Sequence, residues 1–123
     1  MGLDTSLDSS GPVKDVRKVG DATVVTLTGE IDMSCSPAVR RVLLQATAER
    51  AATIVIDASS VPHMDSSGVA TMVEALQKVK RYHGRLVLVG LQDRVRSVFE
   101  IAKLTELFEM KPNLAEALND GRG

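Results

Sequence analysis

Aromatic residues are almost absent from this sequence, and cysteine occurs once. Phe, Trp and Tyr make up 2% of the 123 residues, with no Trp at all, although 44% of the chain is hydrophobic. The core must therefore be built from Val, Leu, Ile, Ala and Met, which pack closely as aliphatic side chains. Because Cys35 has no second cysteine to pair with, an intramolecular disulfide is excluded. The Cys and His residues also lack the spacing of a zinc site.

The chain has neither an excess of one charge nor a long apolar run. Its 15 basic and 16 acidic residues are interspersed and give a formal net charge of -1, which argues against direct binding of nucleic acid. The longest apolar runs span a few residues, far fewer than the roughly 20 that cross a bilayer, and there is no signal peptide. We therefore expect no membrane segment and a cytoplasmic, reducing location.

Hydrophobic periodicity predicts a single α/β domain over residues 13–120, after a flexible N-terminal lead-in at residues 1–12. Apolar segments predict strands at 13–19, 23–28, 53–57 and 85–90, and a short one at 107–110. Apolar residues at helical spacing predict a helix capped by Ser36 with Pro37 in its first turn. Further helices are expected near Val69, near Asp93 and at 113–118. The first two strands are joined by too few residues for a crossover, so the sheet is mixed.

The stretch "DSSG", residues 65–68, lies where the second helix is expected to begin. Asp65 or Ser66 is a suitable N-cap, and such a cap satisfies one free backbone N–H. Capping requires one side chain, however, and three successive residues here could provide it. At least one hydroxyl is therefore available for another role, at a helix end where an anionic group is stabilised by the helix dipole.

Three chemical roles can be considered for this stretch from its residues alone: a nucleophile, a metal ligand and a phosphate acceptor. A serine nucleophile needs a base and an oxyanion hole, and the G-x-S-x-G elbow is absent, so we expect no enzyme. Asp57 and Asp65 could hold a cation between them, but no third carboxylate has suitable spacing, so we expect neither metal nor cofactor. A phosphoacceptor serine needs no base from this chain, because a kinase supplies its own. The charge of a phosphate beside Asp65 would then change the binding of a partner.

Several segments together resemble one known family. "DASSVPHMDSSG", preceded by "GEID" and followed by "RLVLVGLQDRVRSVFEIAKLTELFEM", is similar to a STAS domain, and specifically to the bacterial anti-sigma factor antagonists. The resemblance covers roughly residues 13–118. It implies a STAS-like single domain with a mixed β-sheet of four to five strands and helices packed mainly on one side.

The resemblance also implies a function. Ser67, the second serine of the motif, would be phosphorylated by a partner anti-sigma factor that is also a serine kinase. The unphosphorylated domain would bind that partner and free the sigma factor, and a phosphatase would reset the switch. A scaffold or adaptor role in a stress-signalling or membrane transport complex is the alternative. The remaining residues expected near the site or in contact with the partner are Glu30, Asp32, Asp57, Asp65, Ser66 and Gly68.

Overall fold

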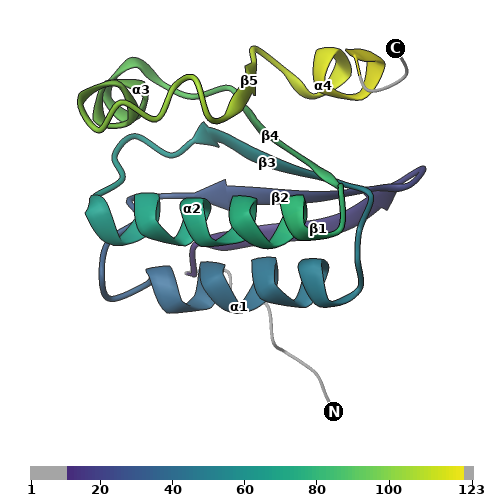
Figure 1. Ribbon diagram of the computed structural model, residues 1–123. Coiled ribbons are helices and arrows are strands. Elements are labelled where there is room, and N and C mark those ends of the chain that lie inside the picture. Colours follow the sequence, from purple (N-terminus) through teal and green to yellow (C-terminus); the bar gives the residue numbers. More distant parts are fainter. Residues whose placement is uncertain (1–10, 121–123) are drawn as a thin grey trace.

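A computed structural model describes residues 11–120 as an α/β fold with one five-stranded sheet (Figure 1). The lead-in predicted at 1–12 lies outside the described residues except for Gly11 and Pro12, and the backbone carbonyl of Pro12 accepts a hydrogen bond from the Thr28 N–H. The strands are β1 (Val13–Val19), β2 (Ala22–Thr28), β3 (Thr53–Ser60), β4 (Arg85–Val89) and β5 (Glu109–Lys111). The helices are α1 (Ser36–Ala48), α2 (Ser66–Arg81), α3 (Asp93–Ile101) and α4 (Leu114–Asp120).

The strands follow one another across the sheet in sequence order, from β1 to β5. β1 and β2 form the predicted antiparallel hairpin, turning at Gly20 with φ 63°, and the pairs from β2 to β5 are parallel. Each connection between parallel strands contains one helix, namely α1, α2 or α3, and such a crossover is what parallel pairing requires. The mixed sheet expected from the sequence is therefore confirmed.

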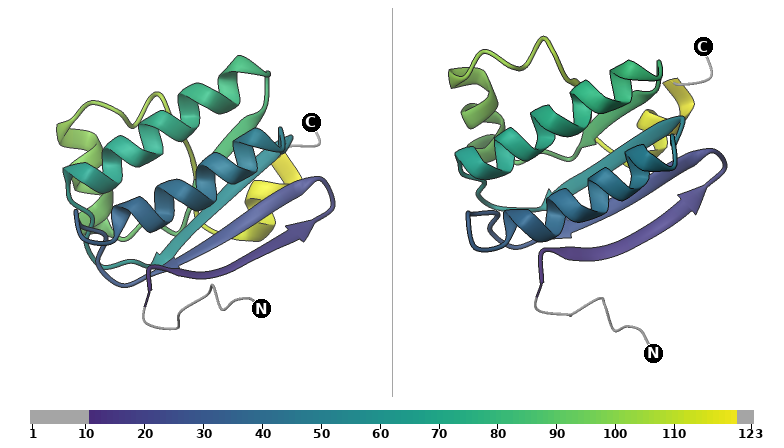
Figure 2. Two further views of the ribbon diagram at one scale, coloured as in Figure 1. Left: turned by 90° about the horizontal axis from the view of Figure 1, so that it is seen from below. Right: turned by 60° about the horizontal axis from the view of Figure 1, so that its bottom comes forward.

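Alternate residues of the central strands face two separate apolar layers. On one face, Ile54, Ile56 and Leu88 pack against residues of α1, α2 and α3. On the other face, Val55 and Val87 belong to a smaller cluster with Ala117 of α4. Figure 2 shows α1 and α2 side by side across the first face, with α4 behind the sheet. Most helices thus cover one side, as predicted.

Several strand and helix boundaries differ from the expectations by one residue or more, and three of them have a physical reason in the structure. The N-cap of α1 is Cys35, whereas Ser36 is the first helical residue and is buried. Strand β3 extends to Ser60 because it continues to pair with β2, as far as the Thr28 and Ser60 partners. The last strand begins at Glu109 rather than at residue 107, because the Phe108 side chain packs edge-on against Phe99 and its backbone N–H bonds to the Leu104 carbonyl.

Candidate functional site

Two loops meet beyond the carboxyl ends of the neighbouring parallel strands β2 and β3. The Gly29 N–H donates to the Ser60 carbonyl at 3.0 Å, and the Ile31 N–H donates to the His63 carbonyl at 3.0 Å. The Asp65 N–H then donates back to the Ile31 carbonyl, also at 3.0 Å. These backbone bonds fix the loop at residues 29–35 against the start of α2. Ligands and partners often bind at this edge of an α/β sheet.

The carboxylate of Asp65 is the side-chain cap of α2. Its Oδ1 atom accepts the Ser67 N–H at 2.9 Å, the Gly68 N–H at 3.4 Å and the Ser67 hydroxyl at 2.6 Å. The hydrogen bond from the Ser67 hydroxyl is the main cause that lowers the pKa of Asp65, and the nearby Asp32 carboxylate opposes it. Ser66 is exposed and begins the helix. The capping role therefore belongs to Asp65, where the sequence had left Asp65 and Ser66 as alternatives.

Ser67 is half-buried, and its hydroxyl is held by a hydrogen bond. Its Oγ donates to Asp65, and its backbone carbonyl accepts a hydrogen bond from the Thr71 hydroxyl at 3.0 Å, one turn along α2. The side chain is thus held in a defined orientation at the first turn of the helix. A hydroxyl that donates its proton to a carboxylate keeps its lone pairs available for attack on an electrophile.

Gly68 is required by close packing beneath this turn. A Cβ atom placed on Gly68 would lie 2.5 Å from Cγ of Met64 and 2.9 Å from Cγ2 of Ile31. Both of those side chains are buried. The glycine therefore allows α2 to approach the loop that carries Ile31, which brings the cap close to the acidic loop.

The loop at residues 29–35 is fixed by its own side chains. The Asp32 carboxylate accepts the Ser34 N–H at 2.9 Å and the Ser34 hydroxyl at 2.6 Å, and these bonds lower the pKa of Asp32. The Cys35 thiol accepts the Asp32 N–H and donates to the Glu30 carbonyl, each at 3.3 Å. Glu30 is exposed. Glu30, Asp32 and Asp65 therefore provide three carboxylates around the same end of the sheet.

Asp57 is not brought together with this group. It alternates with Ile56 and Ala58 along β3 and so shares the face of Val55, on the opposite side of the sheet from α2. Its carboxylate accepts the Ser59 N–H and hydroxyl. The cation site considered between Asp57 and Asp65 is therefore not formed, and residues 11–120 contain no group of three or more potential metal ligands.

Met33 is a feature of the site that sequence reasoning did not single out. Its side chain is 75% exposed, on the same loop as Glu30 and Asp32. A methionine side chain is flexible and polarisable and can adapt to an irregular surface. The available signal was an isolated apolar residue in the otherwise polar segment "GEIDMSCS".

The comparison with known proteins decides the family. The STAS domain profile matches residues 13–117. The chain belongs to the STAS domain family. This STAS domain is 33% identical over 87 residues to the anti-sigma-B factor antagonist of Listeria monocytogenes, covering 71% of this chain and 76% of that protein. It is 31% identical over 96 residues to the anti-sigma-B factor antagonist of Bacillus subtilis, covering 78% and 87% of the two chains.

A solved structure has the same fold as this STAS domain. The anti-sigma factor antagonist SpoIIAA in its unphosphorylated form is 25% identical, with a TM-score of 0.71 over 89% of this chain and 97% of that one. Its phosphorylated form, from Bacillus, has a TM-score of 0.70 over 89% and 98% of the two chains at 24% identity. Within residues 11–120, this STAS domain has no helix that is both long and apolar enough to cross a membrane.

Proposed function

We propose that this STAS domain is an anti-sigma factor antagonist that is switched by phosphorylation of Ser67. In its unphosphorylated state it binds a cytoplasmic anti-sigma factor with serine kinase activity and so frees the sigma factor. The domain is a substrate of that kinase rather than an enzyme. Two relatives named anti-sigma-B factor antagonists support the regulatory role, and a neighbour of the same fold is named in both its unphosphorylated and its phosphorylated form.

The single observation that favours Ser67 as the acceptor is its hydrogen bond to Asp65. The hydroxyl is oriented at a helix N-terminus, with Oγ 2.6 Å from the Asp65 carboxylate, while the neighbouring Ser66 hydroxyl is exposed on the first turn. The kinase therefore meets one positioned hydroxyl at Ser67. The partial positive charge of the helix end also stabilises the phosphate product.

Phosphorylation would reverse the sign of the local interaction. The free hydroxyl donates a hydrogen bond to Asp65. A phosphate at neutral pH carries a charge of about -1.5 to -2, and its oxygens, like those of the ionised Asp65 carboxylate, only accept hydrogen bonds, so the two groups repel each other. Asp32 lies close enough to act electrostatically on Asp65, so the phosphate would join a group that is already acidic. A partner that fits this acidic surface in its neutral-serine form would then have to accommodate or desolvate an added dianion, which weakens binding.

The proposed contact surface comprises the loop at 29–35 and the exposed side of the first turns of α2. Met33 supplies an exposed apolar contact, and Glu30 and Asp32 add negative charge on the same loop. An apolar contact with a charged rim is typical of a specific protein interface. We infer that the partner presents an apolar pocket bordered by basic residues.

The test is an affinity capture with mass spectrometry, using the wild type, Ser67→Ala, Ser67→Asp and Ser97→Asp. We expect the wild type and Ser67→Ala to capture the same kinase-type anti-sigma factor, and Ser67→Asp to lose it. Ser97→Asp is the matched control, because it makes the same substitution at an exposed serine of α3, outside the proposed contact surface, and it should retain the binding. With ATP and the captured partner, one phosphate should appear at Ser67 in the wild type and none in Ser67→Ala.

Two results would contradict the proposal. One is phosphorylation of Ser67→Ala to the wild-type extent. The other is capture of membrane transport or scaffold subunits in place of a kinase, with equal recovery by all four proteins, which would favour the adaptor role instead.

A further inference from the structure

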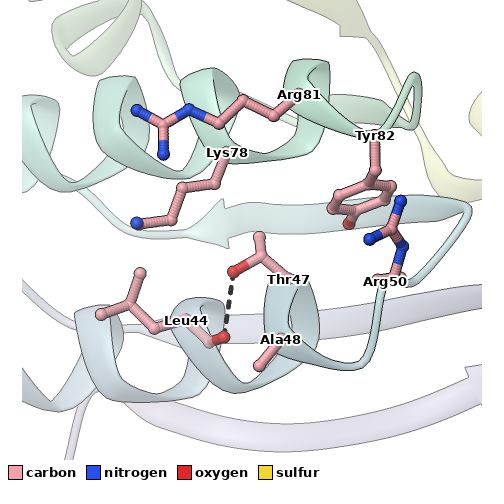
Figure 3. A pocket seen from close by; sticks show the side chains of 7 residues that line it. All are labelled: Leu44, Thr47, Ala48, Arg50, Lys78, Arg81 and Tyr82. Carbon is pink, nitrogen blue, oxygen red and sulfur yellow. Dashed lines mark hydrogen bonds between the residues drawn. The ribbon is translucent and has the colours of Figure 1, made fainter.

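A cavity of about 420 Å³, open to solvent along much of its surface, lies between the C-terminal ends of α1 and α2. Figure 3 shows the side chains that line it, from both helices and from the residues that follow them. Lys78 lies eleven residues beyond Ser67 along α2, which corresponds to about 16 Å at ~1.5 Å per residue. The cavity is therefore separate from the proposed phosphorylation surface. Its lining consists of Leu44, Thr47, Ala48, Arg50, Lys78, Arg81 and Tyr82.

The lining combines three cations with an apolar surface. Figure 3 shows Lys78 and Arg81 extending from α2 toward one end, with Arg50 beside the Tyr82 ring at the other. The Arg50 guanidinium lies 5.3 Å from the Tyr82 ring centroid, and the Tyr82 hydroxyl donates to the Ala51 carbonyl at 2.9 Å. The ring is thus fixed in place. Among the described residues that line the cavity, none is Asp or Glu.

Two neighbouring carboxylates form their hydrogen bonds and ion pairs with residues outside the cavity. Glu49, next to Arg50 in sequence, accepts a hydrogen bond from Gln45 at 2.7 Å and lies 3.6 Å from the Lys18 ammonium on β1. Glu74, one turn before Lys78, forms two hydrogen bonds with the Arg40 guanidinium, at 2.7 and 2.9 Å, and interacts more weakly with the Lys78 ammonium through space. The cavity therefore keeps an excess of positive charge in a chain whose net charge is -1.

A favourable interaction with the helix dipole explains only some of these basic residues. Cations are favoured near the C-terminal end of a helix, and α2 has Lys78, Lys80 and Arg81 in its last turn. The last turn of α1, by contrast, has no basic residue, and Arg50 lies beyond that helix with its guanidinium turned to the Tyr82 ring. Cations from two helix ends thus converge on one cavity, which a requirement for helix capping alone does not explain.

We propose that this cavity binds a small organic polyanion, with two or more phosphate or carboxylate groups on a compact carbon body. Guanidinium and ammonium groups at both ends match separate anionic groups, and arginine binds planar or tetrahedral oxyanions through paired N–H donors. Leu44, Ala48 and the Tyr82 ring provide apolar contact for the body of the ligand. The volume lies within the range of small-molecule sites, about 300–1,000 Å³. The inference does not depend on the proposed role of Ser67.

The test is a titration of the ¹⁵N-labelled full chain with pyrophosphate and, separately, with citrate, at constant ionic strength and followed by NMR. We expect saturable shifts of the amides around the cavity, with Lys78→Glu/Arg81→Glu weakening the Kd at least tenfold. Lys14→Glu/Arg94→Glu is the matched control, because it changes the net charge equally at exposed positions outside the cavity, and its Kd should stay within twofold of the wild type. If the charge reversal does not fold, Lys78→Gln/Arg81→Gln replaces it.

The outcomes distinguish the ligand class and the proposal itself. Tighter binding of pyrophosphate supports a phosphorylated ligand, and tighter binding of citrate supports a polycarboxylate. Equal weakening in both variant pairs would overturn the site, since it would indicate general charge attraction. Shifts that do not saturate, or binding of a poly-glutamate peptide with neither small anion bound, would overturn it as well.

Discussion

Replacing Gly68 with alanine tests the packing that holds α2 against the acidic loop. The added Cβ would lie 2.5 Å from Cγ of Met64 and 2.9 Å from Cγ2 of Ile31. Ile31 and Met64 are at most 1% exposed, so neither side chain has free space to move into. The contacted Met64 atom is Cγ, which is close to the backbone of that residue and cannot swing away easily. Overpacking of this kind costs about 1–3 kcal/mol. The helix propensity of alanine over glycine returns about 0.5–1 kcal/mol.

The net expectation is a loss of about 0–2.5 kcal/mol in the free energy of unfolding for Gly68→Ala, measured by urea denaturation as a lower midpoint at unchanged m-value. Ala70→Gly, at an exposed position in the same turn of α2, calibrates the propensity contribution. In a Met64→Ala background the cost of Gly68→Ala should fall by about 1 kcal/mol, since contacting residues couple. If Gly68→Ala raises the stability by the full propensity contribution, the steric explanation of this glycine is wrong.

Three other predictions concern the acid response and the second half of the fold. The pKa of Asp65 is lowered in the folded state from 3.8, so its stabilising contribution is present above that value and is lost as the pH falls through the folded pKa. Asp65→Asn should therefore reduce the acid-induced loss of stability below about pH 4, and an unchanged pH profile would contradict this. Arg85 donates to the buried Ala117 carbonyl at 2.8 Å and also pairs with the Glu109 carboxylate on β5. Arg85→Met should cost about 1–3 kcal/mol, with the greatest loss of amide protection in α4 and β5; uniform loss across the sheet would argue against this role. Phe99 is fully buried, and its ring centroid lies 5.3 Å from that of Phe108. Phe99→Ala should lower the free energy of unfolding by about 3–5 kcal/mol. A loss below ~1 kcal/mol in thermal or urea unfolding would refute the packing argument.

Much of the fold was predictable because its strands and helices bury regular patterns. The β1 segment at 13–19 and the start of α3 at Asp93 agree with the structure to the residue. Apolar residues at intervals of two or of three to four report directly which face is buried. The boundaries that failed depend on contacts distant in sequence. Strand β3 is longer because of its pairing with β2, and β5 begins later because Phe108 enters the core.

The candidate site shows the same division. The local sequence indicated that Asp65 could cap α2, because a carboxylate at this position reaches the free N–H groups without help from the rest of the fold. It could not decide between Asp65 and Ser66, because that choice depends on the backbone direction into the helix. The bond between the Asp65 N–H and the Ile31 carbonyl contributes to that direction.

The sequence by itself determined the α/β class, the mixed sheet and a helix start at "DSSG", since each follows from local periodicity and capping chemistry. Only the tertiary structure decided which carboxylates share the end of the sheet with Ser67. It brought Asp32 near Asp65 through the pairing of two loops, and it placed Asp57 on the opposite face through the alternation of β3. The cationic cavity between α1 and α2 likewise arises only where two helix ends meet, because its residues lie some thirty positions apart in the chain.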